Sequence, residues 1–220
     1  MIDALYRESL RIARLLFGLL VFSVGVVMTL KANLGYPPWF VFHHGVGLHL
    51  GLTIGTATVL VSFVIILTAV LMKEYVGFGT ICNMIFVGAF VDILLPRDLI
   101  PLMESFVPGV AMMICGLFTL ALGTVIYLGA GYGAGPRDTF MVIITKLTGK
   151  PVGLCRSCIE GMVLFTGWLL GGYAGIGTVI SVFGIGVAVQ TVFSFLRFDV
   201  KTIPRESFYE TFMRFRNMLR

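Results

Sequence analysis

The stretch GAGYGAGPRDTF, residues 129–140, sets alternating glycines, a proline and an Arg–Asp pair between two long apolar runs. Glycine allows a sharp turn because it adopts positive φ at little cost, and proline suits the first turn of a new helix. The start of that helix would offer free N–H groups and the positive end of its dipole. The stretch therefore predicts a broken helix with Arg137 and Asp138 at the break.

The composition indicates an integral membrane protein. The 220 residues are 58% hydrophobic and only 12% charged, whereas soluble domains carry about 25% charged residues. Apolar windows of about 20 residues, each long enough to cross about 30 Å of hydrocarbon, recur along the chain. We predict one integral domain, 1–220, with six spans at 12–32, 53–72, 78–95, 106–128, 152–171 and 177–196.

An internal repeat organises these spans. A shift of 98 residues lays residues 18–95 on 116–193 without a gap, so that eight glycines and one proline coincide. Pro38 falls on Pro136, and GFGT (77–80) falls on GIGT (175–178). The coincident glycine pairs are 18/116, 25/123, 35/133, 51/149, 55/153, 77/175, 79/177 and 88/186.

Each repeat begins with a long span that ends in a glycine–proline break, NLGYPPW (33–39) or GYGAGPRD (131–138). A segment of about 13 residues follows, 38–50 or 136–148, which is too short to span and predicts a re-entrant or interfacial helix. Irregular backbone at membrane depth requires protein or water to satisfy its polar groups. The expected hinge residues are Gly35, Pro38, Gly133, Gly135 and Pro136.

The basic residues set the orientation. With both termini in the cytoplasm, 14 Lys and Arg residues lie inside and only Lys31 and Arg97 lie outside, as the positive-inside rule requires. Three spans in each repeat then make the second copy inverted. If both short segments also cross, the chain has eight spans, parallel copies and a count of 13 against 3. Segment length favours six spans.

Interrupted helices in inverted repeats are typical of secondary transporters, whose site lies near the midplane. Arg137 would bind an anionic group there, or it would anchor to headgroups while Asp138 caps the helix. Glu160, inside the fifth span, is a costly carboxylate that pairs with Arg156 one turn earlier or meets solute or proton. The candidate solute-binding residues are Arg137, Asp138, Arg156, Glu160, Asn83 and Gln190.

Other polar groups indicate no enzyme, metal site or cofactor. Cys155 and Cys158 form one CxxC motif, which is expected to pack helices because no second CxxC or nearby His accompanies it. His43, His44 and His49 do not have a standard metal spacing, and no nucleophile–base pattern occurs. The net charge of +5 comes from basic residues that flank the spans, which suits anionic lipid headgroups and not nucleic acid.

The tail, 198–220, is expected to be cytoplasmic. Within RESFYETFMRFRNMLR (205–220), apolar residues recur along one helical face with arginines elsewhere, which predicts a basic amphipathic helix on the inner leaflet. That face would carry Phe208, Phe212, Phe215 and Leu219.

The loop at 131–138 and the following TKLTGKPVGLCR (145–156) resemble the YczE/YyaS/YitT group of bacterial integral membrane proteins. The resemblance covers most of the chain and implies a multi-pass protein of the bacterial cytoplasmic membrane, without implying a substrate. Two functions stay open. One is a transporter or permease for a small anionic or zwitterionic solute, and the other is a membrane accessory or regulatory protein. A homo-oligomer is compatible with either.

Overall fold

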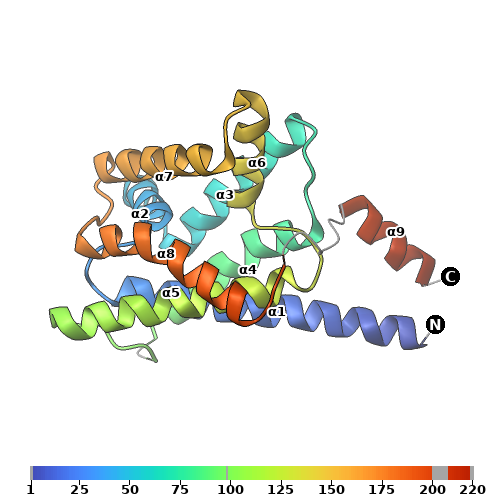
Figure 1. Cartoon of the computed structure of the whole chain (residues 1–220), viewed down its shortest axis with the longest axis horizontal. Coiled ribbons are helices and arrows are strands. Elements are labelled where there is room, and N and C mark those ends of the chain that lie inside the picture. Colours follow the sequence, from blue (N-terminus) through green and yellow to red (C-terminus); the bar gives the residue numbers. More distant parts are fainter. Residues whose placement is uncertain (1, 98, 200–207, 219–220) are drawn as a thin grey trace.

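The computed structural model describes residues 2–97, 99–199 and 208–218, and these residues form helices joined by short connections (Figure 1). The expectation of an all-α membrane protein is confirmed. The helices are α1 (Ile2–Lys31), α2 (Pro38–Leu50), α3 (Ile54–Leu71), α4 (Phe78–Leu94), α5 (Phe106–Leu128), α6 (Pro136–Thr148), α7 (Val152–Leu169), α8 (Ile176–Phe195) and α9 (Phe208–Met218).

Among the described residues, five helices are long and apolar enough to cross a membrane, namely α1, α3, α5, α7 and α8. The remaining predicted span, 78–95, corresponds to α4, which is apolar but has only 17 residues. A helix of that length extends about 25 Å, somewhat less than the hydrocarbon thickness.

Helices α1 and α5 pack side by side and run antiparallel (Figure 1). Their contact is backbone against backbone: a Cβ added at Gly25 would lie 2.8 Å from the carbonyl oxygen of Gly116. Seven residues away on each helix, a Cβ at Gly123 would lie 2.9 Å from the carbonyl oxygen of Gly18. Small residues allow this approach, which is a common basis of helix association in membranes.

The remaining helices surround this pair, and each short helix packs on a helix from the other half of the chain. Helix α4 packs on α1, and α8 packs on α5. The short helix α2 packs on α7 as well as on α3, while α6 packs on α3 and α7. Trp39 of α2, Ile65 of α3 and Ile159 of α7 form one buried cluster at this junction, so the two halves of the chain share a core.

The two helix breaks have the same backbone geometry. Gly35 has φ of 105° and Gly133 has φ of 104°, a region that residues with a Cβ rarely adopt. The residue before each glycine accepts a hydrogen bond from the other half: Gly177 N donates to Leu34 O at 2.6 Å, and Gly79 N donates to Tyr132 O at 2.8 Å. Each break is therefore held by the first turn of a long helix in the other half.

Three connections gather at one end of the molecule. Met103 N donates to Lys31 O at 2.9 Å, which joins the connection after α4 to the end of α1. Tyr36 N donates to Tyr173 O at 2.9 Å, which adds the connection between α7 and α8.

The opposite end holds both described termini (Figure 1). There Arg11 Nε donates to Ala130 O at 3.1 Å, and Lys146 pairs with Glu74 at 2.8 Å. The connections after α3 and α5 therefore lie at the same end as the start of α1.

Helix α9 packs against the protein at that end. Phe208 N donates to Val76 O at 3.0 Å, and Arg214 Nε lies 3.3 Å from a carboxylate oxygen of Glu8 in α1. Thr211 is buried. Of the predicted apolar face, the side chains of Phe212 and Phe215 and the whole of Leu219 lie outside the described residues.

We expect Gly133→Ala to lower the free energy of unfolding by about 1 kcal/mol or more, because alanine is strained at this positive φ. A Cβ there would also lie 3.1 Å from the Cα of Gly77. Thermal unfolding in detergent, followed by intrinsic fluorescence, measures the change. Gly161→Ala is the matched control, since a Cβ at this helical position meets nothing within 4 Å in the described structure. Equal unfolding temperatures for both variants would contradict the role given to Gly133.

Candidate functional site

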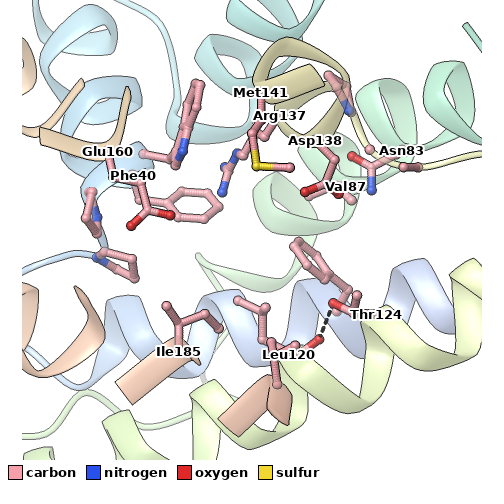
Figure 2. Close-up of a pocket in the computed structure, with 18 of the residues that line it drawn as sticks. Phe40, Asn83, Val87, Leu120, Thr124, Arg137, Asp138, Met141, Glu160 and Ile185 are labelled. Carbon is pink, nitrogen blue, oxygen red and sulfur yellow. Dashed lines mark hydrogen bonds between the residues drawn. The ribbon is translucent and has the colours of Figure 1, made fainter. Parts of the chain in front are cut away.

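A cavity of about 380 Å³ lies where the two halves meet. Figure 2 shows it between α1, α5 and α8 on one side and α2, α6 and α7 on the other. Many residues that line it are equivalent under the shift of 98 residues, so both repeats contribute the same positions. These pairs are Phe22/Leu120, Pro37/Gly135, Pro38/Pro136, Trp39/Arg137, Phe40/Asp138, Thr58/Arg156, Ser62/Glu160, Asn83/Ser181 and Val87/Ile185.

The charge at these positions is confined to the second repeat. The first repeat contributes aromatic rings, hydroxyls and an amide, while the second contributes two arginines and two carboxylates. The site is thus symmetric in backbone position and asymmetric in chemistry.

The start of α6 positions Arg137 and Asp138. Gly135 is the N-cap in an extended conformation, and Pro136 begins the helix. Both following side chains are half-buried and line the cavity. A Cβ at Gly135 would lie 3.4 Å from the amide of Asn83, an ordinary contact distance, so the break lies close to α4.

Arg137 lies over aromatic rings. Its guanidinium carbon is 4.7 Å from the centre of the Phe40 ring and 5.1 Å from that of Trp39. No hydrogen bond or ion pair to the guanidinium is present among the described residues. Because an arginine guanidinium stays protonated in proteins, Arg137 is a cation whose donors face the cavity.

The other three charges have partners or neighbours. Arg156 Nε donates to Glu160 at 3.1 Å, and the Glu160 side chain is only 21% exposed. This is the expected pair one helical turn apart, and both residues line the cavity; Figure 2 shows Glu160 on its wall. Asp138 also lines the cavity, at the start of α6 beside Arg137.

Five of the six predicted solute-binding residues line the cavity: Arg137, Asp138, Arg156, Glu160 and Asn83. The placement of Gln190 is a correction, because its side chain is exposed and does not line the cavity. The reason is helical periodicity. Ser181, Ile185 and Val189 face the cavity at intervals of four residues, and the next residue points about 100° away from them.

Sequence reasoning missed the aromatic side of the site. None of Trp39, Phe40, Thr124 and Tyr127 was predicted as a site residue, although all four line the cavity. Tyr127 is buried, and Gly135 lies close to its hydroxyl. The repeat shift itself carried the missing signal, since Trp39 and Phe40 are the positions equivalent to Arg137 and Asp138 and line the same cavity.

The three histidines of the first repeat make contacts with three different groups. His43 is buried, and its Nδ1 lies 2.8 Å from Thr58 Oγ1. His44 Nδ1 accepts from Tyr173 N at 3.1 Å, and His49 Nδ1 lies 3.1 Å from Gly45 O. In the described part of the chain, no three His, Cys, Asp or Glu side chains lie together as a metal site would need.

The chain is similar to proteins known from bacterial genomes. Over 175 residues, covering 79% of this chain and 80% of the relative, it is 30% identical to "Uncharacterized membrane protein YczE" of Bacillus subtilis. It is 34% identical over 179 residues, 81% of each chain, to an "Uncharacterized protein" of Haemophilus influenzae. "Uncharacterized protein YyaS" of Bacillus subtilis is 28% identical over 169 residues, 75% of this chain and 83% of the relative.

These similarities confirm the resemblance to YczE and YyaS noted from the sequence. No solved structure is significantly similar to the chain. Residues 9–194 match the family described as "Family of unknown function (DUF6198)". Because the match includes both repeats and every residue of the cavity, the chain belongs to this family of membrane proteins.

Proposed function

We propose that the protein is a small secondary transporter of the bacterial cytoplasmic membrane, with two inverted three-span repeats and re-entrant helices α2 and α6. Its solute is small and anionic or zwitterionic, and it binds in the cavity where the two repeats meet. The protein is not an enzyme in this proposal and needs no cofactor.

The crossing of α1 and α5 supports inverted repeats. The shift of 98 residues converts the contact Gly25–Gly116 into Gly123–Gly18, and both contacts are present. It also converts the bond from Gly177 N to Leu34 O into the one from Gly79 N to Tyr132 O, with each repeat in turn the donor. A two-fold axis between antiparallel equivalents produces such exchanged contacts.

The contacts at the two ends support six spans over eight. With eight spans, the connections after α3 and α5 would lie outside while the N-terminus lies inside. Instead Arg11 near the N-terminus bonds Ala130 after α5, and Glu74 after α3 pairs with Lys146. Helices α2 and α6 have 13 residues each, about 20 Å, which also favours re-entrant helices.

The guanidinium of Arg137, which has no hydrogen bond or ion pair among the described residues, is the observation that carries the solute proposal. A cation stacked on two rings, with free donors beside a cavity, suits a carboxylate or phosphate oxygen. The nearby carboxylates of Asp138 and Glu160 suit a cationic group on the same solute. An accessory protein whose polar residues only lock the bundle would have a packed, dry interior, so the cavity beside Glu160 favours transport.

Cysteine labelling tests the six-span topology in intact cells. In a variant without native cysteines, we expect Leu50→Cys to react with a membrane-impermeant maleimide from outside. Leu147→Cys and Lys73→Cys should react only after the membrane is opened. All three side chains are exposed. Reaction of Lys73→Cys from outside would favour eight spans and refute the inverted arrangement.

Arg137→Met should abolish anion binding without loss of stability. Methionine fits an aromatic surface, and removal of a half-buried, unpaired charge offsets the lost cation–π contact, worth about 0.5–2 kcal/mol. A thermal-shift screen with carboxylates, phosphates and amino acids should give stabilising compounds for the native protein and none for the variant. An unfolding temperature several degrees lower without ligand would show that Arg137 is structural.

Glu160→Gln should abolish binding or uptake of a zwitterionic compound found in that screen, because it removes a negative charge while keeping the side-chain shape. The variant should insert and unfold normally, since its bond to Arg156 is only replaced by a neutral one. Ser62→Ala, at the equivalent position of the first repeat, is the control and should retain binding. Normal uptake by Glu160→Gln would make this carboxylate structural.

A further inference from the structure

The first repeat is closed between α3 and α4. These helices touch through Gly55 and Gly88, where a Cβ on either residue would collide with the other's carbonyl oxygen. Asp92 of α4 also caps the start of α3: it accepts from Gly55 N at 2.9 Å, Thr53 Oγ1 at 2.5 Å and Thr56 Oγ1 at 3.1 Å. Close backbone packing and the hydrogen bonds that Asp92 accepts, together called the latch, therefore hold this helix pair together.

The equivalent pair in the second repeat is open. A Cβ at Gly153 or Gly186, the counterparts of Gly55 and Gly88, would meet nothing within 4 Å in the described structure. Gln190, the counterpart of Asp92, is exposed. Helices α7 and α8 scarcely touch: α7 lies beside α2, and α8 lies on α5 (Figure 1).

Helices α7 and α8 are apart at the end of the molecule that holds the chain ends. Helices α7 and α8 are joined by the short connection 170–175 at the end where Tyr173 contacts Tyr36. They diverge toward the end that holds both described termini (Figure 1). Arg156 and Glu160 on α7 and Ser181 and Ile185 on α8 line the cavity, so both helices of the open pair border the candidate site.

We propose that α7 and α8 form the inner gate of the transporter and that Gln190 is its latch. In the closed state Gly153 packs on Gly186, and the Gln190 side-chain carbonyl accepts the N–H of Gly153, as Asp92 does for Gly55. The structure is then the inward-open state. In the outward-open state, α7 and α8 are in contact and α3 and α4 are apart. This inference rests on the proposed transport function.

Local chemistry at the start of α7 supports the latch. Pro151 is the N-cap, and no side chain caps the helix. The N–H groups of its first turn are therefore available to a side-chain acceptor. The hydroxyls of Thr53 and Thr56 are replaced by Pro151 and Leu154, so the inner latch has fewer hydrogen bonds than the outer one. A weaker inner latch agrees with an inner gate that is open at rest.

A disulfide cross-link tests the motion without any solute. In the closed first repeat, the Cγ2 of Val59 lies 2.5 Å from a Cβ placed at Gly88. The counterparts are Ser157 and Gly186, so Ser157→Cys with Gly186→Cys should form a disulfide when the inner gate closes. The background replaces Cys82, Cys115, Cys155 and Cys158 with serine. Met162→Cys with Gly186→Cys is the control, because residue 162 lies on the opposite face of α7 from Gly153.

Variants at the latch residues test whether Gln190 itself stabilises the closed gate or whether α7 and α8 close through general flexibility. Gln190→Ala should slow oxidative cross-linking about fivefold, since a lost helix cap changes the closed population by about that factor. Gln190→Glu restores an acceptor like Asp92 and should cross-link at least as fast as the parent. Asp92→Asn weakens the outer latch and should speed cross-linking. Because residue 190 is exposed, its variants are not expected to disturb folding.

Each outcome bears on one proposal. No cross-link in the parent or in Asp92→Asn, under conditions where both are monodisperse, would overturn the gate. Cross-linking that is indifferent to Gln190→Ala would leave a gate but overturn the latch. These results do not depend on solute, whereas failure of Arg137→Met to alter anion binding would overturn the solute proposal and leave the cross-link unaffected.

Discussion

The backbone contact between α1 and α5 is the constraint on which the rest of the structure depends. Gly18 and Gly25, like Gly116 and Gly123, are seven residues apart and so lie on one face of their helix. An antiparallel crossing brings Gly18 to Gly123 and Gly25 to Gly116. Once this crossing forms, the breaks after α1 and α5 lie at opposite ends of the molecule. The short helices α2 and α6 then both contact α3 and α7.

Equivalent backbone positions then carry unlike side chains. Where the first repeat has Trp39 and Phe40, the second has Arg137 and Asp138, and the two sets meet at the cavity. Stacking a cation on rings costs less than leaving it in hydrocarbon, since the ring faces attract positive charge. The first repeat therefore provides the surface on which the charges of the second can be held.

The sequence predicts the helices well, because each apolar run and each glycine–proline break is a local signal. Every predicted span corresponds to a helix, and α2 and α6 begin at the two prolines named as hinge residues. The pair Arg156–Glu160 was also expected, since i and i+4 side chains meet on a helix. The outward orientation of Gln190 and the packing of α2 on α7 were not predicted, because rotation about a helix axis and contacts between distant segments leave no local pattern.

The inequality of the two latches has a thermodynamic consequence under the proposed function. Exchange between the open states breaks one latch and makes the other, so the resting population reflects the difference between Asp92 and Gln190. The four charges at the cavity sum to zero. A zwitterion leaves that sum unchanged when the gates close, whereas an anion adds an uncompensated charge to a low-dielectric site. Transport of an anion would therefore need a proton or another cation in the same step, and the carboxylates of Asp138 and Glu160 are the groups beside the cavity that can accept one.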